Sequence, residues 1–206
     1  MGLLKDSFLK LPIKQPLSRE AKNGIRFLLD DRGVEPENIL QALNRIRALY
    51  FATFTTYPHY ALLEFYTNKG PASSKLEKSQ YDLKIKLQKL KKASRICKIP
   101  ASSISFDSKY SDEDPEMLQS YYAFAINKED SKNDITELLW LSFASECPHW
   151  MRPAIFFSLY FYDPVRKILL HPYDMRGADL IADNKENIFE CGKEFEDWII
   201  ETNMSF

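Results

Sequence analysis

The sequence has few of the residues that build cofactor and metal sites. Its only three cysteines, Cys97, Cys147 and Cys191, stand far apart in 206 residues. None belongs to a Cys-x-x-Cys pair, so nothing indicates a zinc site, a redox pair or a disulfide framework. The six glycines form no P-loop and no Gly-x-Gly-x-x-Gly or Gly-x-Ser-x-Gly motif, which argues against nucleotide cofactors. We therefore expect reduced thiols and no cofactor.

The three histidines are equally scattered. His59, His149 and His171 make no His-x-x-x-His or His-Glu-x-x-His pattern, so the spacing predicts no metal site. Cys147 and His149 are close in sequence, but a cysteine nucleophile needs its base facing it in space. We expect a protein that is not an enzyme. An active site assembled from separated residues around His149, His171 or Asp174 stays open as a third hypothesis.

Long apolar runs are absent too. No run approaches the length of about 18 residues that spans a bilayer, and Asp6 interrupts the N-terminal apolar residues where a signal peptide needs a continuous core. These features predict a soluble, cytoplasmic protein without a membrane partner. Apolar residues still make up 45% of the chain, which suffices for one core. We expect one domain over residues 1–206, with residues 1–19 as the candidate for a loosely attached N-terminal segment.

Strands and helices alternate in the first two thirds of the chain. A short apolar run from Gly24 to Leu29 predicts a strand that enters a turn. Pro36 then opens a helix whose apolar residues repeat at three- and four-residue spacing as far as Tyr50. The remaining predicted elements here are a strand over Tyr60–Tyr66, a loop over residues 100–115, a strand over Tyr121–Ile126, and a buried helix over Ile135–Ala144 after an Asn133-Asp134 cap.

The last third predicts a hairpin and a helix. Ile155–Tyr162 is the most β-prone stretch, and its consecutive apolar residues favour a central strand that is covered on both faces. Asp163-Pro164 predicts the hairpin turn, and Ala178–Ala182 a further extended segment. Asp183-x-x-Glu186 matches a capping box for a helix expected to end near Glu201. The whole predicts an α+β fold: a single domain with a mostly antiparallel sheet, packed helices and a C-terminal β-hairpin followed by a capping helix.

A net charge of −1 hides an uneven distribution of charged residues. Residues 75–98 hold nine basic and two acidic residues, a difference of +7, whereas residues 174–206 hold nine acidic and three basic ones, a difference of −6. The basic segment predicts a lysine-rich amphipathic helix that could neutralise phosphates. Tyr81 is its only aromatic residue able to stack on bases. A nucleic-acid-associated protein that binds through the lysine-rich helix 75–98 is therefore the alternative function.

The densest polar constellation is Tyr173-Asp174-Met175-Arg176-Gly177. One interpretation is a turn in which Asp174 caps backbone donors, Arg176 pairs locally and Gly177 takes a positive φ. The other is an exposed recognition tip, because arginine and tyrosine are enriched at interface hot spots. A catalytic carboxylate here would need a partner, and the sequence nominates none.

The acidic segments also allow two interpretations. They could keep the protein soluble, or they could complement a basic partner such as the active-site cleft of a nuclease. We expect the second. The residues predicted to contact the partner are Asp112, Glu113, Asp114, Glu116, Tyr173, Asp174, Arg176, Glu190, Glu194 and Asp197.

The order of these segments resembles a bacterial family catalogued as domain of unknown function 3885. The matching parts are Gly24-Ile-Arg-Phe-Leu, Ala42-Leu-Asn-Arg45, the lysine-rich middle segment, the apolar run before Tyr173-Asp-Met-Arg-Gly177, and Asp197-Trp-Ile199. One departure stands out, since the family pattern is closer to Tyr-Asp-Asp-Arg-Gly and Met175 replaces the second aspartate.

What the resemblance implies is a role in bacterial competition. Similar small proteins are encoded in clusters of polymorphic toxins and immunity genes. The resemblance therefore implies an immunity protein that binds and neutralises a cognate toxin C-terminal domain, in contact-dependent growth inhibition or a related system. A basic nuclease is the toxin we expect. If the second aspartate of the family motif has a functional role, this chain lacks it.

Overall fold

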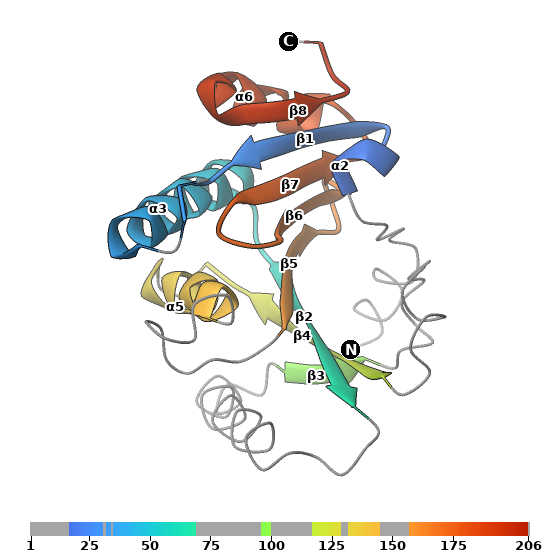
Figure 1. Cartoon of the computed structure of the whole chain (residues 1–206). Coiled ribbons are helices and arrows are strands. Elements are labelled where there is room, and N and C mark those ends of the chain that lie inside the picture. Colours follow the sequence, from blue (N-terminus) through green and yellow to red (C-terminus); the bar gives the residue numbers. More distant parts are fainter. Residues whose placement is uncertain are drawn as a thin grey trace.

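The computed structural model describes residues 17–30, 32–33, 35–68, 96–99, 117–128, 132–144 and 157–205. Eight strands form one sheet in the order β3-β4-β2-β5-β6-β7-β1-β8, and every neighbouring pair is antiparallel (Figure 1). The elements are α2 (Leu17–Glu20), β1 (Asn23–Leu28), α3 (Pro36–Thr53), β2 (His59–Asn68), β3 (Ile96–Ile99), β4 (Met117–Ile126), α5 (Lys132–Ala144), β5 (Ser158–Asp163), β6 (Ile168–Pro172), β7 (Gly177–Ala182), α6 (Glu186–Glu194), the 3-10 turn η2 (Glu196–Trp198) and β8 (Ile199–Thr202). The predicted α+β class with a mostly antiparallel sheet is confirmed.

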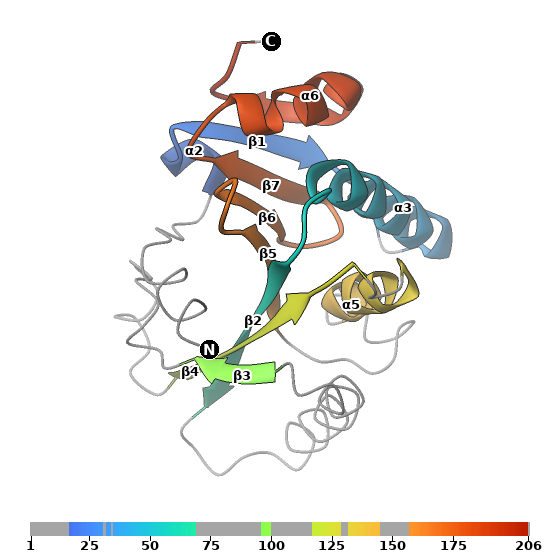
Figure 2. The ribbon, with the colours of Figure 1, turned by 180° about the vertical axis from the view of Figure 1, so that it is seen from behind.

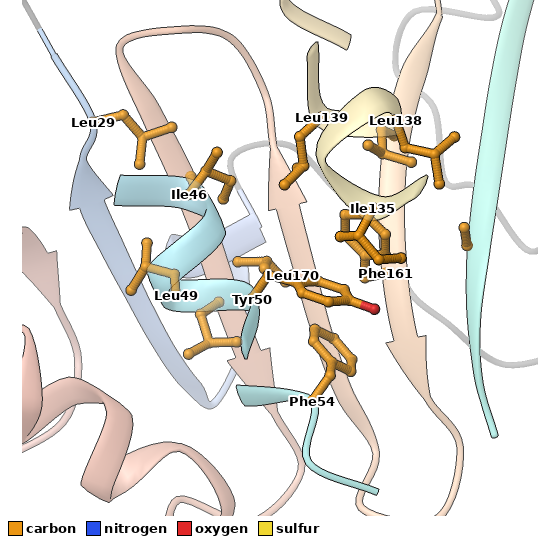
Figure 3. Packing of buried hydrophobic residues seen from close by; sticks show 14 of the residues in the cluster. Leu29, Ile46, Leu49, Tyr50, Phe54, Ile135, Leu138, Leu139, Phe161 and Leu170 are labelled. Atoms are coloured by element: carbon orange, nitrogen blue, oxygen red, sulfur yellow. The ribbon is translucent and has the colours of Figure 1, made fainter. Parts of the chain in front are cut away.

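One face of the sheet is covered by helices. Figure 2 shows α3 and α5 together on this face, with α6 near the β1 end. In Figure 3 the side chains of α3 and α5 meet Phe161 and Leu170 of the central strands. The ring of Tyr50 lies 4.6 Å from that of Phe161. This apolar contact, at about 25 cal/mol per Å² buried, is the main source of stability.

The hairpin of β5 and β6 forms as predicted. The Asp163 Oδ1 atom accepts hydrogen bonds from the backbone N–H groups of Val165 and Arg166 at 2.9 and 3.0 Å. Lys167 closes the turn with a φ of 51°. β5 lies between β2 and β6 and is buried along nearly its whole length, so the prediction of a central, doubly covered strand is confirmed.

The second face of the sheet receives α2. Gly24 points to this face, opposite to Ile25, and a Cβ atom at Gly24 would lie 2.4 Å from the Ser18 carbonyl oxygen. Only glycine lets the short helix approach β1 so closely. Arg19 then reaches Glu201 of β8 at 2.8 Å, which joins the start of the described chain to its end.

The end of the chain differs from the prediction. α6 ends at Glu194 instead of near Glu201, and residues 199–202 form the edge strand β8 against β1. The reason is tertiary, because Ile199 pairs with Phe27 and packs against the core. The predicted capping box is wrong as well. Asp183 pairs with Lys167 at 2.8 Å and gives no cap to the helix.

Smaller differences concern the middle of the chain. β4 begins at Met117, four residues before the predicted start, and α5 begins at Lys132, so the predicted Asn133-Asp134 cap lies inside its first turn. The predicted lysine-rich helix cannot extend to Lys98, because Ile96–Ile99 is strand β3. The rest of that segment, residues 75–95, and the predicted loop over residues 100–115 lie outside the described residues.

Candidate partner-binding surface

The turn between β6 and β7 contains the predicted tip. Asp174 is nearly buried, and its Oδ1 atom accepts the backbone N–H of Arg176 at 2.7 Å while its Oδ2 atom accepts Nε of the same residue at 2.8 Å. The Arg176 side chain is nevertheless 75% exposed. The two interpretations of this segment therefore combine: local turn chemistry orients a guanidinium that the turn presents at the surface.

Gly177 is needed for space and not for its backbone angle. It lacks the positive φ that we predicted, whereas Gly33 has a φ of 112°. A Cβ atom at Gly177 would lie 1.9 Å from the Tyr173 hydroxyl and 2.9 Å from the Phe27 carbonyl oxygen. Glycine is thus required because the Tyr173 ring and the backbone of β1 leave no space for a Cβ atom at this position.

Tyr173 supports the turn from the side of the sheet. The guanidinium of Arg26 lies 5.2 Å from the centre of its ring, a cation–π distance. Arg26 in turn donates to both carboxylate oxygens of Asp179, at 2.8 and 3.0 Å. Burial raises the pKa of the Tyr173 hydroxyl, so this side chain is neutral near pH 7. Its contact with a partner stays a prediction.

Met175, the departure from the family pattern, faces the core. Its side chain is buried in the same apolar cluster as α3 and β1. A carboxylate at this position would be withdrawn from water and would need an internal partner. In this chain, the methionine therefore contributes packing to the turn and no exposed chemistry.

A second Asp-x-Arg-Gly turn lies beside the first. The sequence predicted a turn here after the strand from Gly24, but its likeness to the Asp174–Gly177 turn and the role of Arg32 were missed. This second turn follows β1 at residues 30–33, where Asp30 Oδ2 accepts Arg32 Nη2 at 2.6 Å and Asp30 Oδ1 accepts the backbone N–H of Arg32 at 2.9 Å. This arginine lowers the pKa of the buried Asp30. A hydrogen bond of 2.8 Å from the Leu29 N–H to the Arg176 carbonyl joins the two turns. The repeated Asp-x-Arg-Gly spacing was the available signal.

The acidic residues of α6 and η2 form an exposed surface. We call Glu190, Glu194, Glu196 and Asp197 the α6 acidic face, and all four are exposed. Glu190 and Glu194 are four residues apart and so share one side of the helix. Within the described residues, none of the four makes an ion pair or a side-chain hydrogen bond. Their charges are therefore left for solvent or for a partner.

Strand register brings the tip and the start of η2–β8 to the same end of the sheet. Gly177 pairs with Leu28, and Ile199 pairs with Phe27, so the two segments lie on either side of the end of β1 (Figure 1). Arg45 of α3 joins them, since its Nη1 atom donates to the carbonyl oxygens of Leu28 and Leu29, and its guanidinium lies 5.1 Å from the Trp198 ring centre.

Most predicted contact residues thus gather around one end of β1. Tyr173, Asp174 and Arg176 lie on one side of it, and Asp197 lies on the other. Glu194 and Glu190 follow back along α6. The remaining predicted contact residues, Asp112, Glu113, Asp114 and Glu116, lie outside the described residues.

A row of polar side chains crosses the sheet on the face opposite to α3. Tyr160 donates to Glu64 Oε2 at 3.0 Å, and its ring stacks on that of His171 at 4.2 Å. The strand neighbour of His171 is Asp179, which holds Arg26. We call these five residues the buried polar row. Polar groups that are hydrogen-bonded in pairs and stacked inside the protein are typical of a structural network.

His171 is the member of the row that the sequence nominated for a reactive role. Its Nδ1–H donates to the Leu159 carbonyl oxygen at 2.9 Å, and burial lowers its pKa, so the ring is neutral near pH 7. His149 lies outside the described residues.

Among the described residues, the other two candidates, His59 and Cys191, are also occupied by packing. His59 Nε2 accepts from the Tyr50 hydroxyl, and its Nδ1–H donates to the Thr56 carbonyl oxygen. Burial raises the pKa of the Cys191 thiol to about 11, which leaves little thiolate. In the described part of the chain, no three His, Cys, Asp or Glu side chains are grouped as metal ligands. None of the described helices is long and apolar enough to traverse a bilayer.

Comparison with known proteins places the chain in one family. No curated protein and no solved structure matches it. The profile of a family described as a domain of unknown function, DUF3885, matches residues 2–203. That range contains every segment on which the resemblance was based and the whole described sheet, whose last strand ends at Thr202. The chain therefore belongs to the DUF3885 family.

Proposed function

We propose that this protein is a cytoplasmic immunity protein that binds and neutralises a cognate bacterial toxin domain with a basic surface. The observation that carries the proposal is the α6 acidic face, whose carboxylates are exposed and have no cationic partner among the described residues. The resemblance to proteins encoded beside toxin genes supplies the biological setting. The protein acts by binding, and no catalytic step is assigned to it.

The electrostatics of α6 support a binding role. Like charges four residues apart repel each other, and anions near a helix C-terminus oppose the helix dipole, at a cost of some tenths of a kcal/mol each. Glu190 and Glu194 combine both effects. A basic partner would relieve this repulsion on binding, and opposite surface charge would accelerate the encounter.

The tip adds a group of opposite sign to the same end of the sheet. Arg176 is oriented by Asp174 and exposed, so it can pair with a carboxylate of the partner in a defined geometry. A surface that combines an acidic face with one fixed guanidinium discriminates between partners better than uniform charge does, because a mismatched charge is repelled.

The first experiment identifies the partner and then tests the surface. The tagged protein is purified from its native cells at low and high salt, and the proteins that co-purify are identified by mass spectrometry. A toxin domain found in this way is then co-expressed with the protein, and growth is measured. Nucleic acid that is lost at high salt would instead support the lysine-rich alternative.

Charge reversal then tests the α6 acidic face. The double variant Glu190→Lys/Glu194→Lys should slow association with the toxin by about tenfold or more and abolish protection of growth, because the steering field is reversed. The matched control reverses two exposed acids of α5, Asp134 and Glu137, and makes the same change in net charge away from this surface. Unchanged protection and affinity in the double variant would remove the α6 acidic face from the proposal.

A further inference from the structure

The sheet ends in a short strand whose outer edge carries no described partner. β8 is the last strand of the sheet order, and it pairs with β1 on its inner side alone. In Figure 1 it lies at the edge of the sheet beyond β1. A strand edge with unpaired N–H and C=O groups is a template for another extended chain.

Thr202 directs its backbone toward that outer edge. The N–H of Asn203 donates to the Gly24 carbonyl oxygen of β1. Backbone groups alternate between the two edges of a strand, so the N–H and C=O of Thr202 point away from β1. The Thr202 hydroxyl donates separately to the same Gly24 oxygen at 3.0 Å, which fixes the strand without using its amide.

A bulge places an apolar side chain beside this position. In β1 the neighbours Phe27 and Arg26 pair with Ile199 and Glu201 of β8. Ile200 lies between these two and has no partner in β1, so it is the extra residue of a bulge. Bulges re-aim side chains at sheet edges. Ile200 is accordingly 55% exposed, although it is one of the large apolar residues. An exposed apolar residue within a charged rim resembles the centre of an interface.

The charges around β8 determine what can occupy its edge. Glu196 and Asp197 precede the strand and are exposed, so the start of the edge is acidic, whereas Glu201 within the strand is paired with Arg19. A second copy of this chain paired with β8 would bring these carboxylates together, and like charges across strands are destabilising. A basic segment would meet opposite charges, so the edge favours a basic partner over self-association.

From the outward amide, the Ile200 bulge and the acidic flank, we infer that the outer edge of β8 binds an extended basic segment of a partner protein by strand addition. The inference rests on the proposed function and gives its mode of contact: backbone hydrogen bonds at Thr202, apolar contact at Ile200 and charge pairing along the flank. The α6 acidic face then steers the partner toward this edge.

Amide hydrogen exchange tests whether the edge is available. In the free protein, the Thr202 amide should exchange much faster than the Glu201 amide, which faces β1. Adding a peptide of alternating lysine and valine, as a generic basic strand, should slow exchange at Thr202, whereas a peptide of alternating glutamate and valine should not. A Thr202 amide that is already protected in the free protein would overturn the inference, as would an absence of saturable binding by the lysine–valine peptide.

Two substitutions at Thr202 separate the contribution of its backbone N–H from that of its side chain. Thr202→Pro removes both the outward N–H and the hydroxyl that donates to Gly24 of β1, whereas Thr202→Ala removes the same hydroxyl but keeps the N–H. Thr202→Pro should weaken peptide binding about tenfold relative to Thr202→Ala, as expected for a lost donor that leaves a carbonyl unpaired. Urea unfolding midpoints establish that both variants are folded. Equal binding by both variants would overturn strand addition.

The same variants separate this inference from the proposed function. If Thr202→Pro protects cells from the toxin as well as Thr202→Ala does, while Glu190→Lys/Glu194→Lys fails to protect, the toxin binds the α6 acidic face without strand addition and the inference is overturned. If neither surface affects protection, the proposed function fails too. If Thr202→Pro fails to protect cells while Thr202→Ala protects them, the result supports the inference.

Discussion

The buried polar row and the α6 acidic face contain similar charged groups in opposite circumstances. In the row, Asp179 is almost inaccessible and Arg26 is bonded to both of its oxygens. On the α6 acidic face, Glu190 and Glu194 are exposed, and the described residues offer them no cation. Buried charge that is fully paired serves the fold, whereas exposed charge that lacks an internal partner is available for recognition.

The buried polar row and the α6 acidic face should also differ in how substitutions change the free energy of unfolding. Removing one member of a buried pair leaves the other charge without a partner in a medium of low polarity, so substitutions in the row should be destabilising. Removing an unpaired surface charge leaves no other charge without a partner. Substitutions in the row should therefore change the free energy of unfolding, and substitutions on the α6 acidic face should change affinity with little or opposite effect on stability.

The largest expected effect is the loss of Asp179. Asp179→Ala should lower the free energy of unfolding by about 3 kcal/mol, because it leaves Arg26 without its buried partner. Urea denaturation followed by circular dichroism measures the change. The control Asp183→Ala removes a carboxylate whose pair with Lys167 is exposed and should leave the midpoint nearly unchanged. Equal effects of the two substitutions would contradict a structural role for the row.

The next effect concerns the support of the tip. Gly177→Ala should cost about 2 kcal/mol, since its Cβ would overlap the Tyr173 ring and approach the Phe27 carbonyl oxygen. Gly33→Ala is the control, because nothing lies within 4 Å of its Cβ position and the strain of its φ of 112° is the sole cost. We expect the NMR signals of Tyr173 to shift in Gly177→Ala and not in Gly33→Ala. Unshifted Tyr173 signals in Gly177→Ala would contradict this prediction, because they would show that the turn accommodates the added methyl group without moving the ring.

A smaller effect should appear as pH dependence. Burial lowers the pKa of His171 in the folded state below its ordinary value near 6.5, so below about pH 6.5 the unfolded chain binds the proton that the folded chain excludes. Stability should fall as pH falls through this window, by at most about 1.4 kcal/mol per pH unit for one proton. Unfolding midpoints at pH 7.5 and 5.5 measure the slope. His171→Phe should flatten it, and an unchanged slope would assign the dependence to another group.

The smallest expected effect is a substitution that stabilises the protein, whereas most substitutions destabilise. Glu194→Gln should raise the free energy of unfolding by about 0.5 kcal/mol, because it removes a like-charge contact with Glu190 and an anion from the helix C-terminus. Glu186→Gln, at the N-terminus of the same helix, should lower it by a similar amount. Thermal melts of both variants test the pair. A destabilised Glu194→Gln would mean that this residue serves the fold.

The match between sequence and structure is best where a segment's own pattern specifies its environment. The helix from Pro36 was predicted because its apolar residues repeat at three- and four-residue spacing, and the strand over Tyr60–Tyr66 was predicted from an apolar run that ends at turn-forming residues. The central position of β5 was predicted from its consecutive apolar residues. The predictions for β8 and for the cap of α6 were wrong because residues far away in the sequence determine the local structure there. Ile199 is a strand residue because it pairs with Phe27 of β1.

For the candidate site, local turn chemistry was readable and long-range pairing was not. The Asp174–Arg176 contact spans two residues, so the sequence predicted it. The support of Tyr173 by Arg26 and the true reason for Gly177 depend on β1, which is far away in the chain. Arg32 was missed, although a repeated Asp-x-Arg-Gly motif announced a second turn of the same kind.

The sequence by itself determined which segments are apolar enough to form the core, where the chain turns, and that its last third is acidic. Those properties depend on residue type and short spacing, which a linear pattern contains. The tertiary structure alone decided that Arg26 and Asp179 neutralise each other, that Ile200 is turned outward by a bulge, and that the tip lies across β1 from Asp197. Register between distant strands sets these contacts, because it depends on how the whole apolar surface packs.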